Sequence, residues 1–387
     1  MTTPEGWLYS NIENACSAIF DCEHKTAPYV EQSEFLVVRT NNVKGGRLDF
    51  IDIKYTTASG YNEWTKRTIP KYGDILFTRE APAGESCLVP EKLNVCMGQR
   101  MVLLRPDPKK TDFRFLSHYL SSPFLKADIH KLQIGTTVSR INIHEIKKIR
   151  CPLPPLLEQR KIAEILSCWD RAIENYDQLI ERTTFSFRRL IREFLGDGRK
   201  RINSFIEVAI DNCCDILDTQ RKPLNKEQRN DERGKIPYYG ANGKVGAVDD
   251  WIFDEPLILI AEDGGYFDEY KTRPIAYRIE GKSWVNNHAH VLKAKPHFDQ
   301  NCIFFCLVHK DISQFLNGGT RAKLNRKELE KIVIQLPRTL KEQQLVGATL
   351  DSICNELSLL NGILEKIRLE KQALMQKLLT GKIRLRV

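Results

Sequence analysis

The sequence lacks the long apolar runs that would place it in a membrane. None of its 387 residues belongs to an uncharged apolar stretch near the roughly 18 residues needed to cross a bilayer. The opening MTTPEGWLYS also lacks the basic segment and apolar run of a secretory signal. Eleven cysteines, odd in number and irregularly spaced, indicate reduced thiols used as small apolar residues, not a disulfide framework. We therefore expect a cytoplasmic protein without membrane association.

Sequence signatures of catalysis are scarce as well. The segment Gly281-Lys282-Ser283 lacks the earlier glycine of a phosphate-binding loop. Neither a glycine-rich cofactor loop nor the Asn/Asp-Pro-Pro-aromatic tetrapeptide of a methyltransferase is present. The one nuclease-like pattern places Asp254 or Asp263 before Glu269-Tyr270-Lys271, in the order of a metal-binding D…ExK site. Acidic patterns this short are common, so a solvated turn between strands is the better interpretation.

A structural metal is not predicted either. The residues closest to a ligand set are His288, His290, Cys302, Cys306 and His309, but the sequence has no CxxC pair. Cys302 and Cys306 flank the apolar IFF, which favours burial over metal binding. The two histidines of NNHAH alternate as on a strand, and structural groups and base-edge contacts are equally good interpretations for them.

The charge balance favours a polyanionic partner only mildly. Lysine and arginine number 59 against 50 aspartates and glutamates, a net charge of +9. This sign suits phosphate groups, although the excess is small for a nucleic-acid binder. A hydrophobic content of 42% is ample for burial, and the length suits two domains of roughly 100 to 200 residues.

One segment occurs twice. INIHEIKKIRCPLPPLLEQRKIAEIL begins at Ile141, and LNRKELEKIVIQLPRTLKEQQLVGATL begins at Leu324, a spacing of 183. Glu158-Gln159 then matches Glu342-Gln343 after a slip of one residue. The sequence is therefore duplicated. The aligned pairs are Ile141 with Leu324, Asn142 with Asn325, Glu145 with Glu328, Lys148 with Lys331, Ile149 with Ile332, Leu153 with Leu336 and Pro154 with Pro337.

Each copy continues into about 40 residues without proline, up to Gly196 and Gly381. Apolar residues there step by 4,3,4,3, which is typical of a coiled coil, and only Thr183 and Lys371 interrupt the two seams. The first seam comprises Ile162, Leu166, Trp169, Ile173, Tyr176, Ile180, Thr183, Phe187, Leu190 and Phe194. The second comprises Val346, Leu350, Ile353, Leu357, Leu360, Leu364, Ile367, Lys371, Leu374 and Leu378.

Two such helices, each about 60 Å long, are too long to pack fully against one globular domain. We therefore expect the seams to pair with each other, and two like units related by a pseudo-twofold axis favour an antiparallel pairing. The alternative is two amphipathic helices in unrelated cores, which would not need the same register.

The remaining segments carry short β-branched and aromatic runs between turn signals, such as GDILFTR, RMVLLRP, PLILIAED and HVLKAK. We predict an α/β (α+β) fold in which two domains with small mixed sheets are separated by the two long helices. The predicted boundaries are 1–152 for the first domain, 153–198 for the first helix, 199–336 for the second domain and 337–387 for the second helix.

Longer stretches carry a family resemblance. GDILFTREAPAGESCLV, CMGQRMVLLRP, IPYYGANGKVGAVDDWIFDEPLILIAEDGG and WVNNHAHVLK each precede an LPPLLEQRKIAEIL-type segment and a long helix. Over essentially the whole chain, this order resembles the specificity subunit of type I restriction-modification systems. The resemblance implies two target-recognition domains that each read half of a split double-stranded DNA sequence. It also implies two helices that form a spacer and dock methyltransferase subunits.

The resemblance further implies that this chain is not catalytic. Chemistry would reside in two methyltransferase subunits and in restriction/translocase subunits, which would bind S-adenosylmethionine, ATP and magnesium, so that no cofactor or metal is expected here. Two alternatives differ in class. One is a coiled-coil scaffold that joins two protein-binding domains, and the other is a stand-alone nuclease, which magnesium and DNA alone would reveal.

Candidate DNA contacts fall into two groups. Side chains in the family-like segments have donors for bases or phosphates, with a structural role as the alternative: Arg79, Gln99, Arg100, Asn242, Lys244, Asn287 and His288. Phosphate contacts are predicted in the glycine-containing turns LQIGTTVSRIN and LNGGTRAKLN, at Thr136, Arg140, Thr320 and Arg321. The basic stretch TQRKPLNKEQRNDERGK is a surface loop that either contacts phosphates or is simply solvated.

Overall fold

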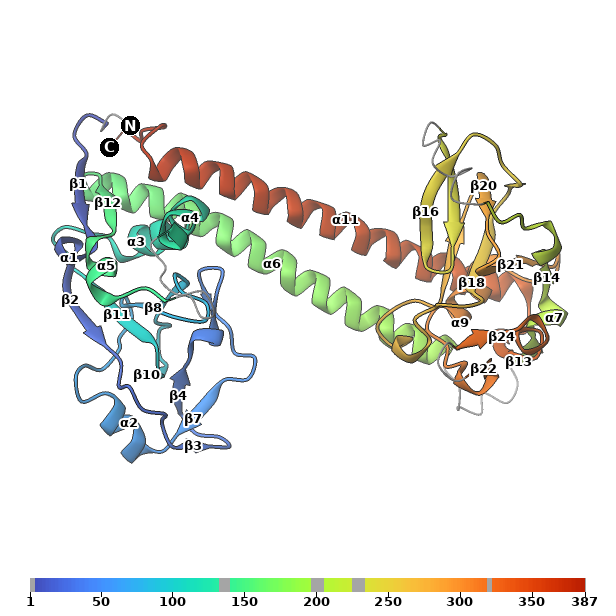
Figure 1. Ribbon diagram of the computed structural model, residues 1–387, viewed down its shortest axis with the longest axis horizontal. Coiled ribbons are helices and arrows are strands. Elements are labelled where there is room, and N and C mark those ends of the chain that lie inside the picture. The colour runs from blue at the N-terminus through green and yellow to red at the C-terminus, as the bar shows by residue number, and fades with distance from the viewer. Residues whose placement is uncertain (1–3, 132–139, 196–204, 225–233, 319–321, 387) are drawn as a thin grey trace. The chain divides into compact units, whose positions relative to one another are not determined.

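Two 40-residue helices, α6 (Leu156–Leu195) and α11 (Leu340–Leu379), organise the chain (Figure 1). The computed structural model describes residues 4–131, 140–195, 205–224, 234–318 and 322–386. Contacts divide the chain into two units, Met1–Asp177 with Gly362–Val387 and Gln178–Asn361. Because this division cuts each long helix near its middle, it does not test the predicted domain boundaries. No helix in the described parts is long and apolar enough to span a membrane.

Unit 1 contains four small sheets and five short α-helices in addition to its halves of α6 and α11, counted over its described residues. The helices are α1 (Ile12–Ala15), α2 (Ala58–Trp64), α3 (Phe113–Leu120), α4 (Pro123–Lys131) and α5 (Ile143–Lys148). The central sheet has the order β2 (Cys16–Asp21), β11 (Met101–Pro106), β8 (Ile75–Thr78), β9 (Ser86–Leu88). A second four-stranded sheet has the order β10 (Asn94–Met97), β4 (Phe35–Val38), β7 (Lys54–Thr56), β3 (Tyr29–Val30). Two two-stranded sheets pair β1 (Leu8–Asn11) with β12 (Arg150–Leu153) and β5 (Val43–Lys44) with β6 (Arg47–Leu48).

Unit 2 repeats this plan. Its central sheet has the order β14 (Cys214–Ile216), β21 (Ala289–Ala294), β18 (Leu257–Ala261), β19 (Ala276–Ile279). A second four-stranded sheet has the order β16 (Gly243–Val248), β15 (Ile236–Gly240), β20 (Lys282–Val285), β17 (Phe253–Asp254). Two two-stranded sheets pair β13 (Phe205–Ala209) with β24 (Val333–Pro337) and β22 (Leu316–Asn317) with β23 (Lys323–Leu324). Its short helices include α7 (Ile210–Cys213), α9 (Gln300–Leu307), α10 (Arg326–Leu329) and the 3-10 turns η2 (Asp218–Gln220), η3 (Phe267–Glu269) and η4 (Ser313–Phe315).

Both central sheets are buried on two faces. Phe77 on β8 and Leu104 on β11 lie in one core with α3 and the long helices, whereas Leu76 and Leu103 lie in a second core on the other face. Successive side chains of a strand point to opposite faces, which explains why whole apolar runs such as ILF are fully buried. Strands β10 and β4 pair in parallel while most others are antiparallel, so the predicted small mixed sheets are confirmed.

The long helices run antiparallel within each unit. In unit 1, Lys371 lies 2.6 Å from Asp170 and Arg368 lies 2.8 Å from Asp177, so residue numbers rise on one helix as they fall on the other. In unit 2, Phe187, Leu190 and Val346 pack against the core that contains Leu350. The predicted fold class is therefore confirmed, including the antiparallel orientation.

All the predicted seam positions whose side chains the structure describes are buried or half-buried. Those that are buried are Ile162, Leu166, Ile173, Leu350, Leu360, Leu364 and Leu378. Those that are half-buried are Trp169, Tyr176, Ile180, Thr183, Phe187, Leu190, Val346, Ile353, Leu357, Ile367, Lys371 and Leu374. Lys371 fits a seam because its ammonium group binds Asp170, which supplies the opposite charge. Phe194 lies in α6, and its side chain is outside the described part.

The repeated glutamine explains why the two sequence copies agree. Gln159 is fully buried, accepts a hydrogen bond from the Asp112 N–H (2.8 Å) and donates one to the Pro154 carbonyl (2.8 Å). Gln343 makes the same two bonds, to the Asp299 N–H (3.0 Å) and the Pro337 carbonyl (2.9 Å). Asp112 and Asp299 are the N-caps of α3 and α9, so one amide joins three elements in each unit.

Gln343→Leu should lower the free energy of unfolding by about 2 to 4 kcal/mol, because it leaves the buried Asp299 N–H and Pro337 carbonyl without these partners. The matched control is Gln344→Leu, at the adjacent exposed position, with an expected change within about 0.5 kcal/mol. Urea unfolding of the purified variants measures both. Equal effects of the two substitutions would contradict the assigned role of Gln343.

A buried histidine joins α3 to α6 in unit 1. The Nε2 atom of His118 lies 3.2 Å from the Ser167 hydroxyl, and its Nδ1 lies 3.7 Å from Asp170. Burial disfavours the charged ring and lowers the pKa of His118 to about 4. The nearby Asp170 carboxylate favours the charged ring, but its effect is smaller. The ring is therefore neutral in the folded protein at pH 7.

This histidine makes stability depend on pH. Between about pH 6.5 and 4 the unfolded chain binds a proton at His118 that the folded chain does not, so stability is lost as the pH falls through this range. The loss should reach roughly 3 kcal/mol at pH 4. His118→Phe should remove this part of the pH dependence, whereas His130→Gln, on the exposed face of α4, should retain it. Urea unfolding from pH 4 to 8 measures the free energy of unfolding of each variant. If the assignment is wrong, the pH profiles of the wild type and of His118→Phe would have the same shape.

Candidate nucleic-acid interface

Four positions in unit 1 have backbone equivalents in unit 2. The Arg79 N–H donates to the Arg100 carbonyl (2.8 Å), as the Glu262 N–H does to the His288 carbonyl (2.9 Å). The Ile141 N–H donates to the Arg79 carbonyl, as the Leu324 N–H does to the Glu262 carbonyl. Isolated bridges then pair Glu80 with Arg140 and Asp263 with Lys323. We call these positions the strand-end clusters: Arg79, Glu80, Arg100 and Arg140 in unit 1, and Glu262, Asp263, His288 and Lys323 in unit 2.

The strand-end cluster of unit 1 is rich in guanidinium groups. Arg79 lies 3.1 Å from Asp21 and is mostly buried, whereas Arg100 lies 3.1 Å from Glu80 and is 53% exposed. Arg140 is exposed at the end of the bridge to Glu80. Two of the three arginines therefore present charge to solvent at the end of the central sheet, where an anionic ligand can approach.

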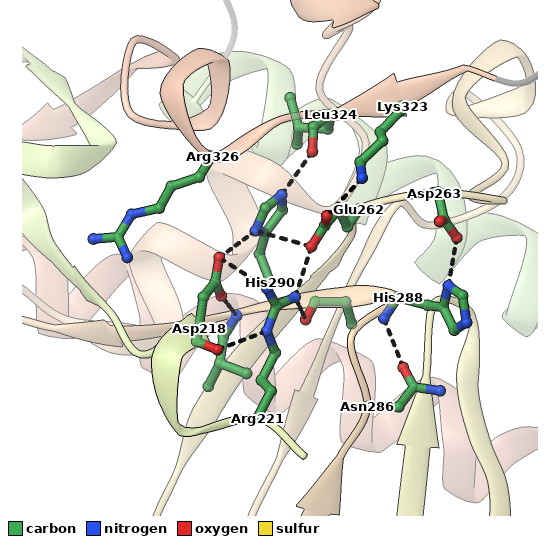
Figure 2. A network of polar contacts seen from close by, with 12 residues as sticks. Asp218, Arg221, Glu262, Asp263, Asn286, His288, His290, Lys323, Leu324 and Arg326 are labelled. Atoms are coloured by element: carbon green, nitrogen blue, oxygen red, sulfur yellow. Dashed lines mark hydrogen bonds and ion pairs between the residues drawn. The ribbon is translucent and has the colours of Figure 1, made fainter. Parts of the chain in front are cut away.

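The strand-end cluster of unit 2 carries the opposite charge at one of its four positions (Figure 2). Glu262, the equivalent of Arg79, receives Arg221 at 2.7 Å and Lys323 at 3.1 Å. His288, the equivalent of Arg100, places Nδ1 2.7 Å from Asp263. The same backbone frame thus carries different donors and acceptors in the two units.

Beneath this cluster lies His290, which is 1% exposed. Its Nδ1 is 2.6 Å from an Asp218 carboxylate oxygen, and its Nε2 is 2.7 Å from the Leu324 carbonyl oxygen. Both ring nitrogens therefore lie within hydrogen-bond distance of an oxygen acceptor. Burial raises the pKa of Asp218, but the hydrogen bond and charge of His290 outweigh this effect and hold it below its ordinary value.

Asp218, Glu262 and His290 also offer ligand atoms within 4.8 Å of one another, the one such set of three in the described residues. Arg221 and Lys323 already bind these carboxylates, and both nitrogens of His290 are engaged. A divalent cation would have to displace these partners at a cost in charge repulsion. We therefore interpret the set as an ion-pair network that joins β18, β21, β23 and η2.

Of the other predicted residues, Asn242, Lys244 and Asn287 are exposed, and Gln99 is half-buried. Asn242 donates to the Gly264 carbonyl (2.8 Å), Lys244 is exposed on β16, and Asn287 is exposed in the turn before β21. Gln99 donates to the His24 carbonyl (3.2 Å) in the turn before β11. Thr136, Thr320 and Arg321 lie outside the described residues.

The nuclease-like pattern does not come together. Asp263 contacts His288 and Glu269 contacts Arg273, and neither belongs to a metal-type set in the described residues. Cys302 lies on α9 in the core of unit 2 and Cys306 packs against that core, where the hydrogen bond with Cys302 and, next, burial raise the pKa of Cys306. All eleven thiols are free.

Reasoning from the sequence missed the partners of these side chains. Lys323 lies 183 residues after Arg140, which is the spacing of the duplication, so the sequence could have predicted Lys323 as the equivalent of Arg140. Asp21, Glu80, Asp218 and Glu262 had no such signal, because they acquire their role through pairing with residues far along the chain.

Taken together, the fold and the two strand-end clusters define a class: a duplicated recognition protein that presents two different polar surfaces on one repeated frame. The family described as "Type I restriction modification DNA specificity domain" matches residues 28–182 and 205–369, and the chain belongs to this family. It is a DNA-specificity subunit, a recognition class rather than a catalytic one.

Relatives and solved structures agree with this assignment. The chain is 28% identical to a specificity subunit from Methanocaldococcus jannaschii over 391 residues, which covers 90% of this chain and 87% of that protein. The MjaVIII specificity subunit of the same organism is 27% identical over 75% of each chain. A Haemophilus influenzae relative is 32% identical, but over 35% of this chain and 34% of that protein. In fold, the chain is similar to the S subunit of M. genitalium, with a TM-score of 0.70, 19% identity and coverage of 98% and 97%.

Arg221→Met should destabilise the protein by about 3 kcal/mol, because it removes a cation from buried carboxylates of Asp218 and Glu262. The control is Arg273→Met, since Arg273 and its partner Glu269 are both about half exposed, and the expected change is within about 0.5 kcal/mol. Thermal and urea unfolding measure the difference. A neutral Arg221→Met would show that the network is not a structural ion-pair cluster.

Proposed function

We propose that each unit reads one half of a bipartite, asymmetric double-stranded DNA sequence. The supporting observation is the pair of strand-end clusters, which occupy equivalent backbone positions but carry different side chains. Arg79 corresponds to Glu262, and Arg100 corresponds to His288. Because base edges are distinguished by their pattern of donors and acceptors, two such clusters favour two different half-sites.

Affinity for the duplex would come mainly from phosphate contacts. The net charge of +9 has the right sign, and Arg140 is an exposed cation in the strand-end cluster of unit 1. Thr136, Thr320 and Arg321 belong to the same proposed phosphate set by their places in the two glycine-containing turns. Such contacts release counterions, so binding should weaken steeply with salt.

The proposed partners follow from the duplication. Each copy of the repeated segment would offer a like surface to one methyltransferase subunit, so that two would dock, and restriction/translocase subunits would complete the complex. S-adenosylmethionine, ATP and magnesium would bind to those partners. This chain would supply the position on DNA at which their chemistry occurs.

Methylation mapping tests the proposal. The chain and its methyltransferase, purified together and supplied with S-adenosylmethionine, should methylate genomic DNA at one bipartite asymmetric sequence. Arg140→Ala should weaken binding to specific and random duplexes alike and reduce the salt dependence by about one unit, because counterion release is independent of sequence.

The control is Lys109→Ala, an exposed lysine outside the strand-end cluster, which should leave the salt dependence unchanged. A complex that methylates no defined sequence and binds no duplex would contradict DNA recognition and favour the scaffold alternative. Sequence-dependent loss in Arg140→Ala would reassign Arg140 from phosphate to base contact.

A further inference from the structure

Arg100 and His288 occupy the same turn of the repeated frame. Each is the last residue before the long central strand, β11 or β21, and each carbonyl accepts the N–H of the equivalent residue at the end of β8 or β18. Each side chain also contacts the equivalent acid. Arg100 Nε lies 3.1 Å from Glu80, and His288 Nδ1 lies 2.7 Å from Asp263 (Figure 2).

In both pairs the cationic or donor side chain faces solvent while the acid is more covered. The side chains of Arg100 and His288 are 53% and 44% exposed, against 24% and 20% for Glu80 and Asp263. A pair that served stability alone would gain little at this exposure. The acid instead holds one nitrogen of each donor side chain, Nε of Arg100 or Nδ1 of His288, and leaves the outer edge, which carries the remaining nitrogens, toward solvent.

The chemistry of the outer edge differs between the units. With Nε of Arg100 directed to Glu80, the two terminal nitrogens of the guanidinium can make paired hydrogen bonds, which match the O6 and N7 atoms of guanine. With Nδ1 of His288 directed to Asp263, the ring offers only Nε2, and thus one hydrogen bond.

The backbone of Arg100 supports a functional role for this turn. Its φ of +67° lies in the left-handed region, which a side chain other than glycine adopts at a cost. Strain of this kind is concentrated at binding sites, where it aims a side chain.

We propose that Arg100 and His288 are one and the same specificity-determining position in the two half-sites, with Glu80 and Asp263 as positioning residues. Arg100 reads a guanine through two hydrogen bonds, and His288 reads one base through a single hydrogen bond. The base pair read by Arg100 is therefore the more strictly specified of the two. This inference rests on the proposed reading of one half-site by each unit.

The test is an exchange between the units, Arg100→His and His288→Arg, in the complex with its methyltransferase. Each variant receives a side chain that the same turn already carries in the other unit. Methylation rates are measured on duplexes in which every base pair of the target is changed in turn. Arg100→His should reduce discrimination at one base pair of one half-site by roughly 10- to 100-fold, and His288→Arg should sharpen one base pair of the other.

The positioning residues give an independent readout. Glu80→Gln should relax the base pair that Arg100→His relaxes, and Asp263→Asn should relax the base pair that His288→Arg sharpens, each by a smaller factor than the exchange itself. Asp263→Glu should restore part of the discrimination. If an exchange variant does not fold, these substitutions decide the matter.

Three outcomes would overturn the inference: uniform weakening over all duplexes, which indicates a phosphate contact; unchanged preference at every position; or effects in both half-sites from one substitution. The wild-type complex separates this inference from the proposed function. If it shows no bipartite target, the proposed function fails; if its target is bipartite and the variants retain it, only the inference fails.

Discussion

A buried glutamine near the start of each long helix is the interaction on which both units depend. Gln159 and Gln343 are the fourth residues of α6 and α11, and each links its helix to the end of a strand and to the N-cap of a short helix. A buried amide is tolerated only when its donors and acceptor are satisfied, so the three elements must come together in one arrangement. The same two hydrogen bonds therefore fix the start of the long helix against the sheets in both units.

This shared frame leaves the strand ends free to vary. Arg79 and Glu262 have opposite charges at equivalent backbone positions, and each is tolerated because its unit supplies its own counterion, Asp21 or Arg221. Both side chains are mostly buried, so each unit keeps the same frame although the charge at this position is reversed. A recognition protein needs this combination, because the fold must stay constant while the sequence that it reads changes.

The unit 2 network also shows how side chains of opposite charge balance one another in a partly buried cluster. Both ring nitrogens of His290 lie beside oxygen acceptors, Arg221 and Lys323 bind Glu262, and Asp218 accepts a hydrogen bond from the Val291 N–H and contacts His290. Each ion has at least one opposite charge and further hydrogen bonds, which is the condition for burying such groups. Three strands and the η2 turn are held together by these contacts.

The sequence by itself determined the duplication, the two helices, their seams and the small mixed sheets. These features follow from local periodicity, which a chain carries in its own residues, and the exception at Lys371 needed only one counterion on the facing helix. Some residues of the strand-end clusters were proposed as contacts because they carry donors in the segments of the family resemblance or in the repeated glycine-containing turn. Only the tertiary structure decided their partners, since Glu80 with Arg140, Arg221 with Glu262 and His290 with Leu324 are far apart in sequence. A long-range ion pair leaves no periodic trace, because its geometry exists only after the strands have paired.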